Sequence, residues 1–247
     1  MNNLFVYLEI EDGKVADVSL ELLTKGNSLA KELNCKLEAV ALGSDLKTVS
    51  EQVSPYGVDA LHVFEDDRLS PYTTLPHTSV LVNLFNKEQP QICLMGATII
   101  GRDLGPRVSS ALGSGLTADC TSLEIGDHED RKQKRNYENL LYQIRPAFGG
   151  NIVAWIINPD QRPQMATVRE GVMKKEFAGT VHEGEVIEYN VNDFVIEDRL
   201  QAKEVNHGAT TIVAPGDGCG KGKEEQSDRY NVLAPGTQPT ARKGNGG

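Results

Sequence analysis

The sequence predicts an α/β protein with three layers, α/β/α, built around a mostly parallel sheet. Two observations support this fold class. Short apolar runs alternate with segments of helical periodicity through the first half of the chain, which is the pattern of βαβ units. These runs are apolar at consecutive positions, as the strands of a parallel sheet are when helices cover both of its faces.

Four apolar runs predict the first strands: Leu4–Leu8, Leu37–Leu42, Ala60–Phe64 and Ile92–Met95. Between the first two, apolar residues recur at helical spacing over 22–33, which predicts a helix. The same spacing over 80–85 predicts a second helix, with Pro76 near its start, where the missing N–H costs no hydrogen bond. Strands joined by such helices are expected to be parallel, with right-handed crossovers.

The pattern changes after Leu123. Three strand-like runs follow one another through Pro- and Gly-rich turns, without helices between them: Tyr137–Ile144, Ile152–Ile157 and Met165–Val168. They predict a mixed edge of the sheet that these later strands complete. The acidic run Asp127–Asp130 and the basic run 131–135 are typical of a solvated loop or hairpin tip. Alternating apolar residues over 186–196 predict one more strand or a connector.

The last part of the chain has a different composition. From Gly216 onward the large apolar side chains are Tyr230, Val232 and Leu233, too few to offset the entropy cost of ordering. We therefore expect a folded domain over 1–195, a linker over 196–213 and a disordered tail over 214–247.

Charge and cysteine usage exclude several classes of protein. The chain has 25 Lys and Arg against 35 Asp and Glu, a net charge of −10, and such a chain is repelled by nucleic acid. No apolar run reaches the roughly 18 residues that span a bilayer. The four cysteines are far apart and form no C-x-x-C, which favours a reducing compartment. We expect a cytoplasmic protein without nucleic-acid binding or membrane insertion.

The segment Gly96–Asp103 has the glycine spacing of a phosphate-binding loop. Arg102 stands where that motif needs lysine, and Asp103 stands where it needs a hydroxyl for magnesium. We therefore interpret Asp103 as the cap of a following helix, with Leu104, Val108, Ala111 and Leu112 facing inward and Gly113 at its end.

Several polar residues lie where an open α/β sheet usually carries ligands. Arg102 and Arg107 follow the carboxyl end of a predicted parallel strand. Thr117, Asp119 and Thr121 alternate, so one strand face is expected to present polar groups to a partner or to water. No histidine has metal-ligand spacing, and no nucleophile motif is present. The sequence thus predicts a protein that is not itself an enzyme.

Arg145 precedes Pro146, which holds it extended. The pair Gly149–Gly150 permits another molecule to approach the backbone closely. An arginine held there can contact a bound molecule. The alternative is a tight hairpin turn with an exposed arginine.

Four motifs together resemble one family: GATIIGRDLGPRV, GLTADCTSLEI, RPAFGGN and RPQMATVREGV. Over residues 1–213 the chain resembles the alpha subunit of electron-transfer flavoproteins. The resemblance implies an adenine-nucleotide-hydrolase-like fold, a beta-subunit partner, and FAD as the carrier of electrons from acyl-CoA-type dehydrogenases, as in fatty acid β-oxidation. It also implies that Arg145 approaches a flavin of the beta subunit and that the interface includes Arg102, Arg107, Thr117, Asp119, Phe148, Gly149, Gly150 and Asn151.

The chain departs from this family after residue 213. The motifs of the FAD domain do not follow, so the alpha-subunit FAD site is expected to be absent. With suitable synonymous codons, residues 227–247 read one nucleotide out of register resemble a helix of that domain, which suggests a frameshifted tail. Three alternatives stay open: an assembly module for the beta subunit, an inactive fragment, and a nucleotide-binding enzyme of the same fold superfamily.

Overall fold

The computed structural model describes residues 3–130, 134–147, 152–179, 184–194, 201–206 and 209–213. The chain divides into two compact units, Met1–Asp198 and Arg199–Gly247. In the second unit, β13 (Gln201–Asn206) pairs antiparallel with β14 (Ala209–Val213). The segment predicted as a linker over 196–213 therefore contains a hairpin. The predicted tail over 214–247 lies outside the described residues.

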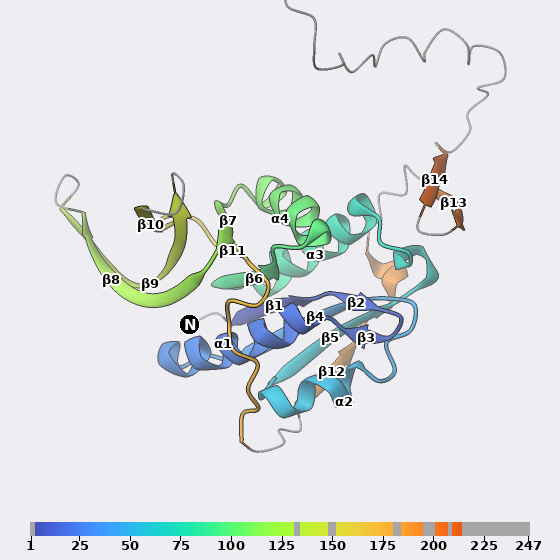
Figure 1. Cartoon of the computed structure of the whole chain (residues 1–247), viewed down its shortest axis with the longest axis horizontal. Coiled ribbons are helices and arrows are strands. Elements are labelled where there is room, and N and C mark those ends of the chain that lie inside the picture. Colours follow the sequence, from blue (N-terminus) through green and yellow to red (C-terminus); the bar gives the residue numbers. More distant parts are fainter. Residues whose placement is uncertain are drawn as a thin grey trace, which may run out of the picture. The chain divides into compact units, whose positions relative to one another are not determined.

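A seven-stranded sheet forms the centre of the first unit, in the order β12-β5-β4-β1-β6-β11-β7. Its strands are β1 (Leu4–Leu8), β4 (Leu37–Gly43), β5 (Ala60–Glu65), β6 (Ile92–Gly96), β7 (Leu116–Cys120), β11 (Gln164–Val168) and β12 (Glu185–Glu188). Helices α1 (Asp17–Leu33) and α2 (Val49–Val53) cover one face, and α3 (Thr74–Glu88) and α4 (Ile99–Leu112) cover the other (Figure 1). The short elements are β2 (Ile10–Glu11), β3 (Lys14–Val15), η1 (Ser54–Tyr56) and η2 (Asp67–Leu69). The predicted three-layer α/β/α class and its first four strands are confirmed.

Strand β1 shows why the apolar runs are continuous. Leu4, Val6 and Leu8 belong to the core beneath α1, and Phe5 and Tyr7 belong to the core beneath α3 and α4. Because successive side chains of a strand point to opposite faces, both faces of β1 need apolar residues.

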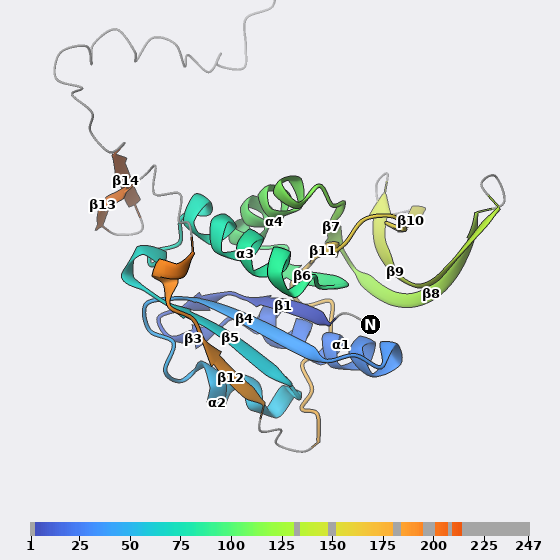
Figure 2. The same ribbon diagram turned by 180° about the vertical axis from the view of Figure 1, so that it is seen from behind.

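Three long strands form a separate antiparallel sheet, here called the arm: β8 (Ser122–Asp130), β9 (Arg135–Ala147) and β10 (Ile152–Ile156). The arm curves away beside β7, at the edge of the central sheet farthest from β12 (Figures 1 and 2). Asp130 pairs with Arg135 across the β8–β9 hairpin. The predicted hairpin at the opposite-charge runs is confirmed, and residues 131–133 lie outside the described part.

The predicted mixed sheet edge is wrong. All neighbouring strands of the central sheet are parallel, and β11 lies between β6 and β7 rather than at an edge. The run around residue 140 pairs with β8, and the run around residue 155 pairs with β9, so both belong to the arm instead. Antiparallel and parallel partners thus separate into two sheets.

The alternating segment over 186–196 forms a strand, one of its two predicted outcomes. Strand β12 pairs with β5 and is followed by the short helix η4 (Val191–Asp193). Buried His62 lies 3.0 Å from the Tyr189 hydroxyl through Nδ1 and 2.8 Å from Glu38 Oε2 through Nε2. Tyr189 also stacks on Phe64, with ring centroids 4.5 Å apart. These contacts fix the segment to the edge of the sheet.

Candidate functional site

The strand order reverses between β1 and β6, and the carboxyl ends of such neighbouring strands are where open α/β sheets usually bind ligands. Here the position is filled by the protein itself. Glu9, directly after β1, is 6% exposed, and both its carboxylate oxygens lie 2.8 Å from the Thr98 hydroxyl. Thr98 caps α4, and its hydroxyl accepts a hydrogen bond from the Gly101 N–H at 3.0 Å.

The environment of Glu9 disfavours its charged form. Burial raises the pKa of the Glu9 carboxyl, the Thr98 hydroxyl opposes that rise, and the charge of Glu170 adds to it. A carboxylate at the start of α4 occupies the place that an anion would otherwise take at a helix N-terminus. The structure therefore agrees that Gly96–Asp103 is not a phosphate-binding loop.

The two glycines of this segment serve close packing. A Cβ atom added to Gly96 would lie 2.8 Å from Glu9 Oε1, and one added to Gly101 would lie 1.8 Å from the Gly96 carbonyl oxygen. The first turn of α4 therefore rests directly on the end of β6.

The predicted cap at Asp103 is wrong. Thr98 caps the helix instead, and Asp103, one turn inside it, accepts a hydrogen bond from the Tyr72 hydroxyl at 2.9 Å and another from Thr74. Leu104 and Val108 are buried as predicted, and Gly113 ends the helix with a φ of 64°. The predicted inward positions at Ala111 and Leu112 are wrong, since Ala111 is exposed and Leu112 is half-buried at the end of the helix.

Charged residues converge at the carboxyl ends of β6, β11 and β7. Arg169, directly after β11, holds Asp119 with two hydrogen bonds, from Nε at 3.2 Å and from Nη2 at 2.7 Å. Arg102, in the first turn of α4, approaches the same carboxylate to 3.4 Å. The Arg169 hydrogen bonds lower the pKa of the Asp119 carboxyl below its ordinary 3.8, and the charges of Arg169, Arg102 and Arg145 lower it further.

Arg145, on β9 of the arm, is the third cation of this group. Ile144, its neighbour, accepts a hydrogen bond from the Thr121 N–H at 2.8 Å, so Arg145 lies beside the end of β7. Its charge opposes the burial that raises the pKa of the Cys120 thiol to about 12. We call Arg102, Asp119, Arg145 and Arg169 the arginine cluster.

Asp119 reaches this place through an irregular backbone. Its φ is +64°, and the register with β11 shifts between Thr117 and Cys120, so β7 carries one extra residue. The Asp119 N–H donates to Thr167 Oγ1 at 3.0 Å instead of to a strand carbonyl. The predicted polar face of Thr117, Asp119 and Thr121 is therefore wrong: the shift breaks the alternation, and Thr117 is 5% exposed.

Arg107 does not join the arginine cluster. It lies 4.0 Å from Asp103 through Nε, and both line a groove of about 660 Å³ between α3 and α4. Phe148, Gly149, Gly150 and Asn151 lie outside the described residues. On either side of them, β9 and β10 pair antiparallel, with Ala147 opposite Ile152.

Sequence reasoning missed two members of this region. Arg169 follows the buried strand β11, and Glu9 follows β1. Both obey the rule that identified Arg102, since each is a charged residue at the carboxyl end of a parallel strand. Applying that rule to every predicted strand would have found them.

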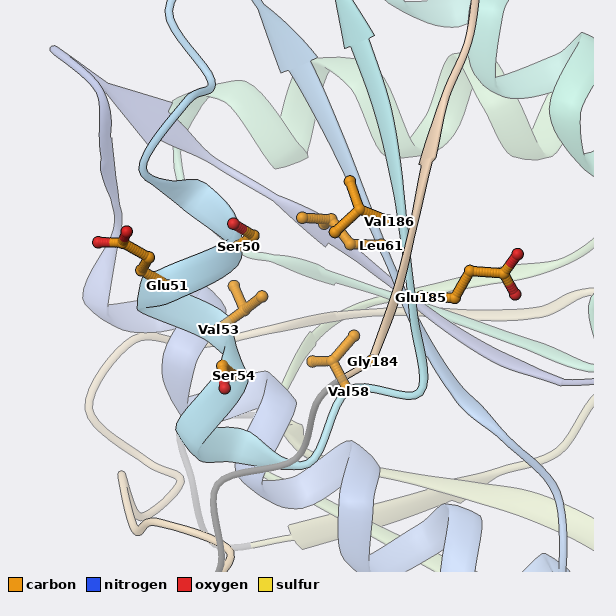
Figure 3. Close-up of a pocket in the computed structure, with 9 residues that line it drawn as sticks. All are labelled: Ser50, Glu51, Val53, Ser54, Val58, Leu61, Gly184, Glu185 and Val186. Atoms are coloured by element: carbon orange, nitrogen blue, oxygen red, sulfur yellow. The ribbon is translucent and has the colours of Figure 1, made fainter.

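A second hollow, of about 270 Å³, lies between α2 and β12 at the opposite edge of the sheet. Val53, Val58, Leu61 and Val186 surround it, and the carboxylates of Glu51 and Glu185 point away from it (Figure 3). Ser50 and Ser54 also line it, but with both carboxylates directed away, its residues do not suggest a reaction.

The described ranges contain no group of three or more His, Cys, Asp and Glu residues arranged to hold a metal ion. Cys93 and Cys120 are fully buried, as predicted, and Cys35 is half-buried. None of the helices in these ranges is long and apolar enough to cross a membrane.

The ion pairs of Asp119 predict a pH-dependent stability. We expect Asp119→Asn to lower the free energy of unfolding by about 1 kcal/mol at about pH 7. The folded carboxyl has the lower pKa, so its stabilisation is complete above the ordinary aspartate range and is lost as the pH falls through the folded pKa. The difference between the two proteins should therefore shrink toward about pH 3, measured by urea unfolding.

Asp12→Asn is the matched control, since Asp12 is an exposed aspartate with a φ of 49°. Asparagine tolerates this backbone region as well as aspartate does, so both substitutions keep the backbone. A pH-independent difference for Asp119→Asn, or equal behaviour of the two variants, would contradict the prediction.

Comparison with known proteins identifies relatives of this chain. Residues 4–194 match the family model of the electron transfer flavoprotein domain. The chain is 42% identical over 189 residues to the electron transfer flavoprotein subunit alpha of Megasphaera elsdenii, which covers 76% of this chain and 53% of that protein. It is 37% identical over 240 residues to the subunit of the same name from Thermoanaerobacterium thermosaccharolyticum, covering 94% of this chain and 68% of the relative.

A third relative has a different printed name. The acryloyl-CoA reductase electron transfer subunit beta of Anaerotignum propionicum is 35% identical over 245 residues, covering 89% of this chain and 66% of that protein. The chain thus spans about half to two thirds of the length of these curated relatives.

Proposed function

Because this chain belongs to the electron transfer flavoprotein family, as an alpha-type N-terminal domain, we propose that it is the partner-binding part of a two-subunit electron carrier. The partner is a beta-type subunit of the same family. FAD carries the electrons, and acyl-CoA-type dehydrogenases supply them, as in fatty acid β-oxidation. The relatives are named as electron transfer subunits, which supports a carrier rather than an enzyme.

The main support for this proposal is the exposed apolar surface of the arm. Ile152, Val153 and Trp155 of β10 are 55%, 55% and 58% exposed. Successive residues of a strand point to opposite faces, so β10 presents apolar side chains on both faces of an edge strand. Exposed apolar surface of this kind marks interaction sites. A beta-type subunit seated on the arm would remove it from water.

The arginine cluster would extend that interface toward the central sheet. Ile99, in the first turn of α4, is 92% exposed and stands three residues from Arg102. Exposed apolar side chains mark interaction sites, and arginine is enriched among the residues that dominate binding energy. We include Arg102, Arg107, Asp119 and the segment 148–151 in the proposed interface, and leave out Thr117 because it is buried within this domain.

FAD does not fit the ligand position of this sheet. A dinucleotide pyrophosphate binds at a helix N-terminus beside the point where the strand order reverses. Here the buried Glu9 side chain and the Thr98 hydroxyl already occupy that position. The flavin of the proposed carrier would therefore be held outside the described residues. We propose a cytoplasmic location, which the buried thiols of Cys93 and Cys120 support.

Co-expression with a beta-type subunit from the same genome tests the proposal. We expect the two chains to co-purify as a one-to-one complex through size-exclusion chromatography. A yellow complex with flavin absorbance supports the carrier. A colourless complex supports the alternative, an assembly module without its own cofactor, which the filled position at Glu9 favours. Failure of the two chains to associate would overturn both.

A further inference from the structure

The arginine cluster carries more positive charge than its own carboxylate neutralises. Arg102 and Arg169 contact one aspartate, Asp119, and the charge of Arg145 acts on the same carboxylate. With the exposed Glu170 beside Arg169 also counted, the local excess is one positive charge in a chain whose net charge is −10. The Arg102 side chain is 60% exposed and that of Arg169 is 47% exposed, so both can be reached from solvent.

Asp119 orients the arginines of the cluster without using all of their hydrogen-bond donors. A guanidinium has five N–H donors, and Asp119 accepts two from Arg169 and one from Arg102. A non-glycine residue with a φ of +64° is conformationally unfavourable, and such residues cluster at functional sites. The bulge therefore places a carboxylate where it fixes two arginines and leaves most of their donors for another group.

The remaining donors select the class of that group. A phosphate monoester carries about −1.5 to −2 charges at neutral pH and three acceptor oxygens, so it can accept hydrogen bonds from several guanidinium groups at once. Arginine is also the residue whose planar fork suits bidentate phosphate binding.

We propose that Arg102 and Arg169, which Asp119 holds, bind a phosphate group at the carboxyl ends of β11 and β7 together with Arg145 of the arm. The site lies beside the filled position at Glu9, not in it. The phosphate comes either from free pyrophosphate or from a nucleotide. The inference deepens the proposed function, because it assigns a ligand to the face that we propose as the interface. It rests on the proposed function only in this respect.

One carboxylate opposes such a ligand. Glu170 follows Arg169 and is exposed, and its charge raises the pKa of the Glu9 carboxyl, so it lies on the side of the cluster toward β1. Neutralising Glu170 should therefore tighten phosphate binding, whereas removing a cluster arginine should weaken it.

The experiment uses the full chain alone, without a beta-type subunit, at low ionic strength. Isothermal titration with pyrophosphate, ADP and adenosine separates the phosphate from the nucleoside. We expect pyrophosphate and ADP to bind and adenosine not to bind. Equal affinities for pyrophosphate and ADP indicate that the phosphate groups alone are a sufficient ligand. Tighter binding of ADP than of pyrophosphate indicates that the phosphate comes from a nucleotide.

Single substitutions assign the site. Arg102→Gln and Arg169→Gln should each weaken binding at least about tenfold, the value of one charge-assisted hydrogen bond of about 1.4 kcal/mol. Glu170→Gln should tighten it by about twofold to fivefold. Arg107→Gln is the matched control, because it removes the same charge from the same helix outside the cluster, and it should change affinity less than about twofold.

Arg102→Lys and Arg169→Lys, which keep the charge, replace any glutamine variant whose circular dichroism shows loss of fold, and each should still weaken binding. Absence of saturable pyrophosphate binding, equal losses in Arg107→Gln and the cluster variants, or adenosine binding as tight as ADP would each overturn the inference. None of these outcomes depends on whether a beta-type subunit binds.

Discussion

Alanine in place of Gly101 is expected to destabilise the first unit by at least about 3 kcal/mol, enough to leave much of the chain unfolded. The reason is a clash with backbone, since the new Cβ atom would lie 1.8 Å from the Gly96 carbonyl oxygen. That oxygen belongs to the end of β6 and has no rotamer that could move it away. To relieve the clash, the first turn of α4 must separate from the sheet and from Glu9.

Gly105→Ala is the control for this prediction. It makes the same substitution one turn later in α4, where the new Cβ atom would meet the Thr167 methyl group at 3.2 Å. A methyl group can give way, and alanine gains up to about 1 kcal/mol in helix propensity over glycine. The expected change is therefore within about 1 kcal/mol.

Urea unfolding followed by far-ultraviolet circular dichroism measures both variants. The single tryptophan of the chain, Trp155, is 58% exposed in the arm, so its fluorescence reports the core poorly. Similar unfolding midpoints for Gly101→Ala and Gly105→Ala would show that the close approach of α4 to β6 is not required.

The sequence predicts the central sheet well because its signal is local. Leu4–Leu8 is buried on both faces, so apolar residues at every position predict a parallel strand that helices cover on both faces. The order of strands is not local. The run Met165–Val168 has the same apolar composition as the earlier runs. That composition does not indicate that the strand lies between β6 and β7.

The predicted start of α4 is wrong for a different reason. The cap is predicted at Asp103 because this carboxylate stands where a phosphate-binding loop needs a hydroxyl. Ile99 is in fact 92% exposed, and Thr98 is the cap. Threonine is also a preferred N-cap residue, so the sequence offers two caps within six residues.

Two residues of the arginine cluster can be predicted from the sequence, but their contact cannot. The strand-end rule identifies Arg102, and the polar alternation around residue 119 identifies Asp119. Their contact depends on a left-handed residue and an extra residue in β7. Arg145 joins them from the arm, a sheet that the sequence did not distinguish from the central one.

Trp155→Glu is expected to weaken binding of a beta-type subunit at least about thirtyfold, as loss of an interface hot spot of about 2 kcal/mol does. Trp155 is 58% exposed on β10, with its ring edge-on to Tyr142 at 5.8 Å. A charge at this position would have to be buried without a partner when the subunits associate. The variant chain itself should keep its fold, because the side chain contributes little to the core.

Phe177→Glu is the matched control. Phe177 is 72% exposed and packs on Tyr56, with ring centroids 5.4 Å apart, so the same aromatic-to-acid change is made on an exposed ring outside the arm. Surface plasmon resonance with the purified beta-type subunit should give a loss of affinity for Trp155→Glu and less than about a threefold change for Phe177→Glu. The reverse order would move the interface from the arm to the surface around Tyr56, whereas equal losses would point to a general effect of added negative charge on a chain that already carries a net charge of −10.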